Sequence, residues 1–521
     1  MKFKRASGIL LHPTSLPGQY GIGDIGPQAH EWVDYIASTG CKLWQVLPLG
    51  PTGYGDSPYQ SFSSFAGNPY IISPEALIDD GLLKPDDLVQ KPDFSPDEVD
   101  FGRLIPWKMA LLNRVYQRHK ESRSPEMQQE LARFRDQKAS WLDDFALFMA
   151  IKEALGGVSW SEWPRPLRLR DPYSLHQARQ EYQDVIDRHV FFQFIFFRQW
   201  SALKEHAMRN GVQIIGDIPI FVAHDSADVW ANKDLFYMDS EGHPTVVAGV
   251  PPDYFSPTGQ LWGNPLYRWD VHEASGYKWW LNRLRGVLEM VDIVRLDHFR
   301  GFAGYWEVPA GNPTAEFGRW VPGPRGKFIE AVLDSLGDLP IIAEDLGVIT
   351  DDVLKLLDTF ELPGMKIFQF AFLTDPSDIF MPHNYPQNCV AYTGTHDNDT
   401  SLGWFRNAPE SERDFCLRYL DLEGEQGLVW KIIRTVWSTA AAFTLAPMQD
   451  FLELGSEARM NMPGNPAGNW GWRMTQSDMS EGLRDKIKEI NYLFYRDRSN
   501  EEVKPGISSS EFTKAPDDYP G

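Results

Sequence analysis

The sequence predicts an α/β protein built on a (β/α)8 barrel, the TIM-barrel fold, and two observations lead to this prediction. Short apolar runs alternate with helical patterns along most of the 521 residues, and several of the runs stop abruptly in charged residues. Strands of a parallel barrel behave in this way, because their carboxyl ends open onto one face where polar side chains collect. Eight runs qualify as barrel strands, centred on Leu10, Val46, Ile215, Val294, Ile342, Ile367, Val390 and Leu445.

The N-terminal part of the chain predicts one βαβ unit. Residues 8–12 form the first apolar run, and residues 27–40 follow with a helical pattern that starts at a proline and ends at a glycine, the residues that favour the two ends of a helix. The second strand covers residues 43–49, and a crossover of this length implies a parallel pair. Residues 50–69 then form a long loop rich in glycine, serine and aromatic residues. Loops of this length are usually functional.

Residues 76–185 are predicted to be a mainly helical insertion at the barrel rim, because their segments are charged and amphipathic and carry no strongly apolar run. Residues 187–211 continue as a long helix, which leads into the third strand at residues 212–220. The range 221–270 mixes glycine, proline and aromatic residues. This composition is typical of a binding loop or lid over the barrel face.

After a helix at residues 277–288, strands and helices alternate up to the eighth strand. Residues 453–475 follow this strand and are predicted to form a second lid loop on the same face. The barrel is therefore predicted to comprise residues 1–75 and 186–499, with helical and loop insertions and without a C-terminal β-domain. Residues 500–521 are polar, with proline and glycine, and are predicted to be a flexible tail.

The composition excludes several classes of partner. The formal net charge is -22 at pH 7, which argues against nucleic acid and against an anionic membrane surface. The three cysteines, Cys41, Cys389 and Cys416, are too few and too widely spaced for a disulfide framework or a zinc cluster. No apolar run approaches the length of a membrane span, and the N-terminus lacks the features of a secretory signal. We therefore expect a soluble cytoplasmic protein.

Aromatic residues make up 13% of the chain, and core packing accounts for most of them. The others lie beside asparagine, glutamine and aspartate in loops rich in glycine and proline. Loops of this kind can stack on sugar rings while they bind sugar hydroxyls. For a single loop aromatic such as Tyr59 or Trp262, packing against the barrel explains its presence equally well.

Three carboxylates, those of Asp297, Glu344 and Asp397, follow three of the predicted strands. Capping of the next helix explains any one of them, but three on one barrel face indicate chemistry. Arg295 precedes Asp297 by two residues, so both side chains leave the same face of the strand, which in a barrel is the interior. Without a metal cluster or a phosphate loop, this set favours glycosyl chemistry, which needs one ionised and one protonated carboxyl group. Arg295 would keep Asp297 ionised, whereas burial and the neighbouring negative charge would raise the pKa of Glu344.

Four motifs carry a resemblance to a known family. They are Gly216-Asp217-Ile218-Pro219, Arg295-Leu296-Asp297-His298, Ala343-Glu344-Asp345-Leu346-Gly347 and Gly394-Thr395-His396-Asp397-Asn398. They match four regions of the α-amylase type in the same order. The chain resembles the 4-α-glucanotransferases of the amylomaltase (disproportionating enzyme) type, glycoside hydrolase family 77, which belong to the α-amylase clan. The resemblance extends from Gly8 to Trp472.

The resemblance implies that α-1,4-glucan segments move from a donor maltodextrin to the 4-hydroxyl of an acceptor, with retention of configuration. It assigns the nucleophile that forms a glycosyl-enzyme to Asp297 and the general acid/base to Glu344. Asp397 would be the third acid, which binds ring hydroxyls and distorts the sugar. Maltodextrin, amylose, starch or glycogen chains and glucose or maltose are the expected partners. We expect neither a cofactor nor a metal, and a monomer or weak homo-oligomer.

The resemblance also suggests which residues bind the substrate. Arg295 and His396 would orient the nucleophile and hold the reacting sugar, and Asp217 and His298 would complete the polar floor of the site. Loop residues match positions that line the donor and acceptor subsites, and these residues are Ser57, Tyr59, Asp253, Gln260, Trp262 and Asn465.

Other functions remain open. An α-glucan hydrolase of the amylase type would use the same carboxylates, although the loops around 254–255 and 463–465 are expected to overhang the cleft and favour a sugar hydroxyl over water. A non-catalytic maltodextrin-binding barrel would lack one of the three acids, and none is missing. A phosphosugar enzyme would need a glycine-rich phosphate loop after the seventh or eighth strand. The turn at residues 393–395 is too short for such a loop.

Overall fold

The computed structural model describes residues 3–497 except residues 123, 253–255, 348 and 466. The tail predicted at 500–521 therefore lies outside the described residues. Eight parallel strands form the centre of the molecule, and they are β1 (Ala6–Leu10), β2 (Leu43–Gln45), β3 (Gln213–Pro219), β6 (Ile293–Asp297), β9 (Ile341–Ala343), β10 (Gly364–Ile367), β11 (Cys389–Tyr392) and β12 (Phe443–Pro447). Their order in the sheet is β10-β11-β12-β1-β2-β3-β6-β9.

The two edges of this sheet approach each other. The N–H of Ala343 in β9 donates to the carbonyl oxygen of Pro363, the residue before β10, at 2.9 Å. The sheet therefore forms a nearly closed barrel, which confirms the predicted fold. Seven of the predicted strand centres lie inside these strands, and Val46 directly follows β2. The runs are apolar because both faces of each strand are covered, one by the barrel interior and the other by helices.

Amphipathic helices cover the outside of the barrel. In α17 (Leu428–Ser438), the buried residues Leu428, Ile432 and Val436 recur every four positions, so one face packs inwards. The other helices around the barrel are α1 (Pro27–Ser38), α8 (Gln183–Arg209), α11 (Lys278–Met290), α13 (Gly326–Leu336), α14 (Asp351–Thr359), α15 (Ser401–Asn407), α16 (Glu410–Leu420) and α19 (Glu481–Leu493). In the part of the chain that the structure describes, no helix is both long enough and apolar enough to cross a membrane.

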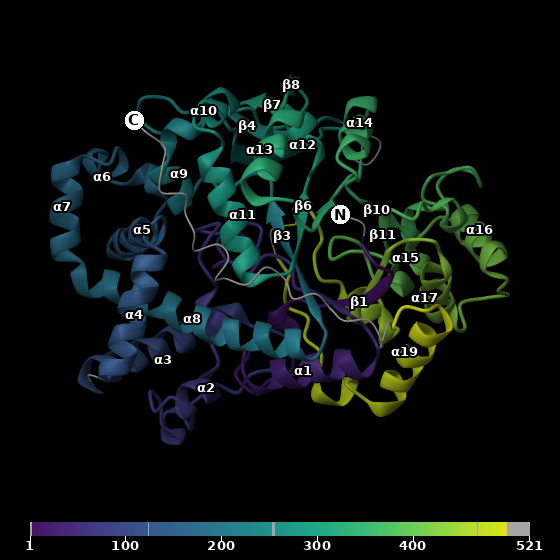
Figure 1. Ribbon diagram of the computed structural model, residues 1–521, viewed down its shortest axis with the longest axis horizontal. Helices are drawn as coiled ribbons and strands as arrows, with labels where there is room; N and C mark the ends of the chain where they lie inside the picture. The colour runs from purple at the N-terminus through teal and green to yellow at the C-terminus, as the bar shows by residue number, and fades with distance from the viewer. Residues whose placement is uncertain (1–2, 123, 253–255, 348, 466, 498–521) are drawn as a thin grey trace.

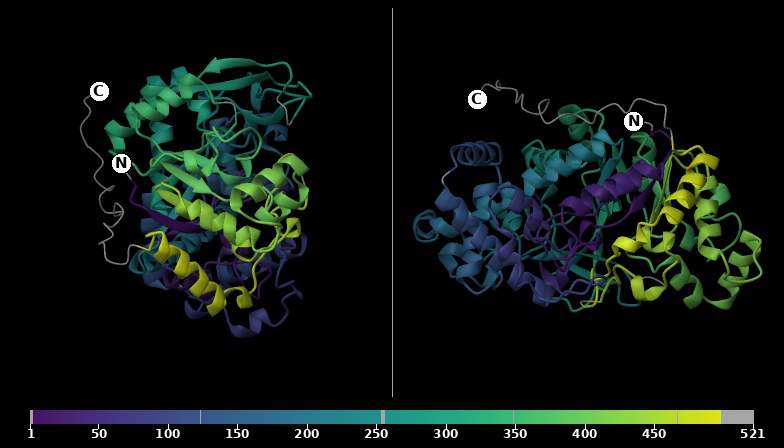
Figure 2. Two further views of the ribbon diagram at one scale, coloured as in Figure 1. Left: turned by 90° about the vertical axis from the view of Figure 1, so that its right-hand side faces the viewer. Right: turned by 90° about the horizontal axis from the view of Figure 1, so that it is seen from below.

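A group of helices separates β2 from β3. Its members are α2 (Pro74–Asp79), α3 (Phe101–Ser122), α4 (Pro125–Gln137), α5 (Leu142–Ala154), α6 (Arg165–Arg168) and α7 (Pro172–Glu181). Helix α8 contacts α3 and α5 as well as α1, so it joins this group to the barrel. The group lies to one side of the barrel, opposite α15, α16 and α17 (Figures 1 and 2).

A second, antiparallel sheet was not predicted. Its strands are β4 (Val246–Val250), β5 (Gln260–Pro265), β7 (Gly304–Pro309) and β8 (Arg319–Pro322), in the order β5-β4-β7-β8. It lies beside α10 (Trp269–Ala274) and α12 (Arg300–Ala303) at one edge of the molecule (Figure 1). Strands β4 and β5 fall within 221–270, a range predicted to be a binding loop or lid. The strands are short, three of them end at proline, and β8 is largely exposed, so no long apolar run marks them.

The register of the barrel brings three charged residues together. Strands β3 and β6 pair in parallel, with Asp217 beside Arg295 and Pro219 beside Asp297. Directly paired residues of neighbouring strands point to the same side of a sheet, as do residues two apart on one strand. Asp217, Arg295 and Asp297 therefore enter the barrel interior close to its carboxyl-terminal end.

Candidate active site

Arg295 lies at the centre of the site. Its Nη1 and Nη2 donate to Oδ1 of Asp297 at 2.6 and 2.9 Å, and Nη1 lies 3.3 Å from Oδ2 of Asp217. Burial alone would lower the pKa of Arg295, but the two carboxylates more than offset this effect, so its pKa lies well above its ordinary value. Arg295 therefore stays charged. It binds Asp297 through Oδ1, while the Asp297 side chain, 27% exposed, borders an open cavity.

A polar network supports the other side of Arg295. The Tyr59 hydroxyl donates to Oδ2 of Asp217 at 2.7 Å, and Gln45 Nε2 donates to Oδ1 at 3.4 Å. The Tyr392 hydroxyl in turn donates to Gln45 Oε1 at 3.0 Å. Burial raises the pKa of Tyr59 well above its usual value, so its hydroxyl stays protonated as a donor. Gln45 and Tyr392 were not predicted, and the available signal was a polar group inside an otherwise apolar strand.

Glu344 follows β9 and has a different environment. The backbone N–H groups of His298 and Leu346 donate to its Oε2 and Oε1 at 2.7 and 2.8 Å. His298 has a φ of 51°, a left-handed conformation that non-glycine residues rarely adopt, in the tight turn that directs its N–H to Glu344. Burial and then the negative charge of Asp297 raise the pKa of Glu344 to about 8 despite these bonds. Glu344 is therefore protonated at neutral pH.

The pKa of Asp297 is subject to opposing effects. Burial raises it above its usual value, and the guanidinium of Arg295 opposes that rise. Asp297 accepts two charge-assisted hydrogen bonds from Arg295, whereas the donors to Glu344 are neutral backbone groups. Charge-assisted bonds to an ionised acceptor are roughly twice as strong as neutral ones. A negative charge in this pair therefore favours Asp297.

Asp397 approaches the site from the loop after β11. Asn461 Nδ2 donates to its Oδ1 at 2.6 Å, and His396 Nε2 lies 3.3 Å from the same oxygen. The ring of His396 stacks on Tyr59 with centroids 5.0 Å apart and an interplanar angle of 8°, and Trp470 packs 5.7 Å from His396. Asn461 and Trp470 lie in the predicted lid loop but were not predicted as site residues. Their contacts link this loop to the third acid.

An open cavity borders Asp297, Tyr59 and Trp470, and its volume of about 670 Å³ is typical of small-molecule sites. Among the predicted site residues, its lining includes Ser57, Tyr59, Trp262, Asp297, His298 and Asn465, and Phe221, Asn461, Pro463 and Trp470 also line it. The rings of Trp262 and His298 meet nearly at right angles with centroids 4.8 Å apart. Burial lowers the pKa of His298 to about 4, so its imidazole is neutral at pH 7. The cavity thus offers neutral aromatic surfaces beside a charged floor, which suits a sugar.

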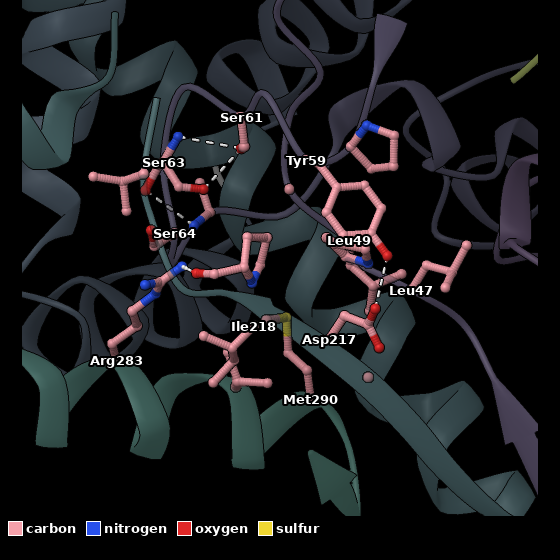
Figure 3. Close-up of a pocket in the computed structure, with 18 of the residues that line it drawn as sticks. Leu47, Leu49, Tyr59, Ser61, Ser63, Ser64, Asp217, Ile218, Arg283 and Met290 are labelled. Atoms are coloured by element: carbon pink, nitrogen blue, oxygen red, sulfur yellow. Dashed lines mark hydrogen bonds between the residues drawn. The ribbon is translucent and has the colours of Figure 1, made fainter. Parts of the chain in front are cut away.

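A second open cavity, of about 780 Å³, has Asp397 and Trp404 in its lining. It shares Met462, Asn465 and Asn469 with the first cavity, so the loop that contains them lies between the two. A third cavity holds only about 50 Å³, room for water but not for a sugar ring. Tyr59 and Asp217 border it, with the Tyr59 hydroxyl directed at Asp217 (Figure 3). A sugar ring therefore fits the two open cavities and not this one.

The structure does not place two of the predicted substrate contacts, Gln260 and Asp253, in the lining of the cavity. Gln260 is exposed and accepts a hydrogen bond from Trp262 Nε1 at 3.2 Å, and it is not among the residues that line the cavity. Asp253 lies outside the described residues, as do residues 254 and 255, which were expected to overhang the cleft. Within the residues that the structure describes, no group of three His, Cys, Asp or Glu side chains is placed to hold a metal ion.

Comparison with known proteins agrees with this geometry. Residues 11–478 match the profile of the family described as 4-alpha-glucanotransferase. A 4-alpha-glucanotransferase of Thermus thermophilus is 51% identical, over 92% of this chain and 97% of that protein. The chloroplastic/amyloplastic 4-alpha-glucanotransferase of Solanum tuberosum is 44% identical, over 94% of this chain and 85% of that protein.

A solved structure gives the same result in three dimensions. The amylomaltase from Streptococcus agalactiae, solved in complex with acarbose, is 41% identical and superimposes with a TM-score of 0.92. The match covers 95% of this chain and 100% of that one. With a match along nearly its whole length in sequence and in fold, this chain belongs to glycoside hydrolase family 77, the 4-alpha-glucanotransferases.

Proposed function

We propose that this protein moves α-1,4-glucan segments from a donor maltodextrin to the 4-hydroxyl of a glucose or maltodextrin acceptor, through a covalent glycosyl-Asp297 intermediate. Family membership supports the reaction class. The observation that carries the mechanism is the unequal environment of two carboxyl groups. Asp297 binds a buried guanidinium, whereas the pKa of Glu344 is raised to about 8. Retaining glycosyl transfer needs such a pair, one ionised and one protonated.

The reaction proceeds in two displacements. In the first, Asp297 attacks C1 of the reacting sugar, and Glu344 gives its proton to the leaving glycosidic oxygen. In the second, Glu344, now ionised, takes the proton from the acceptor 4-hydroxyl, whose oxygen attacks C1 and displaces Asp297. Two inversions at C1 retain the α configuration. Arg295, between Asp217 and Asp297, orients the nucleophile throughout.

Asp397→Asn is expected to lower kcat for maltotriose by about 100-fold with a much smaller change in KM. The reason is that the Asp397 carboxylate, oriented by Asn461, would bind ring hydroxyls more strongly in the transition state than in the ground state. Steady-state kinetics check this prediction. A raised KM with unchanged kcat would instead assign Asp397 to ground-state binding. Its side chain is 46% exposed, so the melting temperature should stay near that of the wild type.

The value of kcat/KM is expected to fall as the pH rises above about 8. Glu344 must be protonated to release the leaving group, and its raised pKa of about 8 keeps the proton on it up to that pH. The acidic limb should lie above the value of an ordinary aspartate, because burial raises the pKa of Asp297. Initial rates with maltotriose from pH 4 to 10, with folding followed by circular dichroism, test both limbs. A profile that stays flat to pH 10 would contradict the role of Glu344.

The loop that contains Met462 and Asn465 supports transfer over hydrolysis, because its residues line both open cavities and would cover a bound glucan against water. Incubation with maltotriose tests the choice. Glucose together with a ladder of longer maltodextrins, and little gain in reducing ends, is the result expected of a disproportionating transferase. Rising reducing ends without longer products would establish the hydrolase instead. Binding of maltodextrin without turnover would establish a binding barrel.

We also propose that the protein works in the cytoplasm as a monomer or weak homo-oligomer. Cys41, Cys389 and Cys416 are buried free thiols, which suits a reducing compartment. Sedimentation velocity over a hundredfold range of protein concentration tests the oligomeric state. A concentration-independent dimer would contradict this proposal.

A further inference from the structure

Residues 393–401 run from the end of β11 to Ser401, the first residue of α15 (Ser401–Asn407), and this segment, here called the loop, carries His396 and Asp397. We propose that Asp450, which is not one of the three acids Asp297, Glu344 and Asp397, is a positioning residue. It fixes both ends of the loop and thereby places Asp397 for catalysis. The inference rests on the proposed function in one respect, since it assumes that Asp397 acts in glycosyl transfer. The placement of the loop does not depend on that function, and hydrogen exchange tests it separately.

Asp450 accepts hydrogen bonds from both ends of the loop. Thr393, at the start of the loop, donates from Oγ1 to Asp450 Oδ2 at 2.5 Å. Ser401, at the end of the loop, donates from its backbone N–H to Oδ1 and from Oγ to Oδ2, both at 2.7 Å. One carboxylate therefore ties together two points that are eight residues apart in the chain.

The position of Asp450 makes it a rigid anchor. It lies in α18 (Met448–Phe451), which directly follows the barrel strand β12, and it is 1% exposed. None of the ion pairs among the described residues involves Asp450. The groups that donate to its carboxylate are the two hydroxyls and the backbone N–H of Thr393 and Ser401. A buried carboxylate that loses such donors pays a desolvation cost. The loop and the barrel end are therefore coupled.

The loop itself transmits this placement. Asn398 Oδ1 accepts from the N–H and Oγ1 of Thr395 at 2.9 and 2.8 Å, so the middle of the loop is braced internally. Asn461 and Arg459 then contact the loop from outside, since Arg459 Nη2 donates to the Asp397 carbonyl oxygen at 2.6 Å. Without Asp450 the loop loses its bonds to this carboxylate at both ends and is held by outside contacts to its middle, such as those from Arg459 and from Gln369 Nε2, which donates to the Asp399 carbonyl oxygen at 2.8 Å. Asp397 is then less restrained relative to Asp297, which is fixed on β6.

Asp450→Asn and Asp450→Ala test the kinetic consequence. We expect kcat for maltotriose to fall about 10-fold and about 100-fold, because a shift of roughly 1 Å in a catalytic group can cost that much. KM should change less than kcat. Thr393→Val removes one of the same bonds and should be milder, and in the Asp450→Asn background it should add little further loss. Thr393→Val also keeps the proposal testable if the Asp450 variants fail to fold.

Asp292→Asn is the matched control. Asp292 also accepts a backbone N–H, from Ile214 at 2.8 Å, and its side chain is 13% exposed, but it precedes β6 at the opposite end of the barrel. The Asp292→Asn substitution should lower the melting temperature without lowering kcat. If Asp450→Asn lowers the melting temperature but leaves kcat unchanged, as expected for Asp292→Asn, the positioning role is overturned. Asp450 would then only stabilise the fold.

Hydrogen exchange separates this proposal from the proposed function. In Asp450→Asn, amides of residues 393–401 should exchange at least about tenfold faster than in the wild type, while those of β3 and β6 stay unchanged. This readout does not depend on activity. Unchanged exchange would overturn the placement claim even in an active enzyme. If exchange rises but the wild type shows no transfer on maltotriose, the proposed function fails and the loop anchor stands.

Discussion

Replacing Asp297 with Asn is expected to abolish glucan transfer, with kcat at least about 10⁴-fold below the wild type. An amide oxygen cannot attack C1 as a carboxylate does. The substitution should leave the fold intact, because the Asn oxygen can still accept the bonds that Arg295 now gives to Oδ1. Maltotriose disproportionation measures the loss, and the melting temperature checks the fold.

Asp292→Asn is a suitable control for this variant too. Asp292 and Asp297 lie just before and at the end of the same strand, β6, so the control makes the same chemical change at the end of the barrel away from the cavities. Activity within tenfold of the wild type in Asp297→Asn would exclude the nucleophile role. A comparable loss in Asp292→Asn would show that the effect is structural.

Glu344→Gln is expected to reduce transfer between maltodextrins by about 10³-fold, because glutamine cannot protonate the leaving oxygen. With an activated donor such as α-maltosyl fluoride, Asp297 forms its bond to C1 as the C1–F bond breaks, and fluoride leaves without protonation, so the first step should survive in this variant. The glycosyl-enzyme should then accumulate, because no base activates the acceptor. Mass spectrometry of the peptide that contains Asp297 should show the added maltosyl unit. An adduct on another residue, or none, would contradict the covalent mechanism.

The same variant has an expected effect on stability. The folded-state pKa of Glu344 is raised to about 8, so the protonated form is the one that folding favours. The contribution of protonated Glu344 to folding stability is fully present below the pKa that Glu344 has in the unfolded chain. This contribution is lost as the pH rises through about 8. A glutamine side chain is neutral at every pH, but its amide nitrogen cannot accept the bond that one of the two backbone N–H groups now donates, so Glu344→Gln should melt below the wild type at pH 4. Its melting temperature should rise relative to that of the wild type between pH 4 and pH 9. A difference that stays constant over this range would contradict the raised pKa of Glu344.

The parts of the site that could be predicted are those that depend on local pattern. Arg295 and Asp297 are two residues apart on a strand, so alternation alone places them on one face, and the structure has them in direct contact. The barrel strands were recognisable because burial on both faces demands continuous apolar runs. Tertiary packing decided the rest. Gln45 and Tyr392 join the network through hydrogen bonds between residues that are far apart in the chain.

The strands of the antiparallel sheet could not be predicted from local sequence pattern either. Strand β8 pairs with β7 through Trp306 and Trp320, yet most of β8 is exposed, so its sequence has no reason to be apolar. A strand of this kind is stabilised by its partner and not by its own pattern. The range 221–270 could be recognised as unusual in composition. Within it, β4 forms a strand by pairing with β7, a contact between distant parts of the chain that no local signal encodes.

The sequence by itself determined the eight-stranded barrel, the family and the strand ends that carry Asp297, Glu344 and Asp397, because alternation, hydrophobic runs and motif order are properties of the chain. Only the tertiary structure decided how their protonation differs. The pKa of Glu344 depends on how deeply it is buried and on its distance from Asp297, and the anchoring of Asp397 depends on Asn461 and Asp450 from other elements. Electrostatic energies follow distances and burial in space, and neither quantity is a function of separation along the chain.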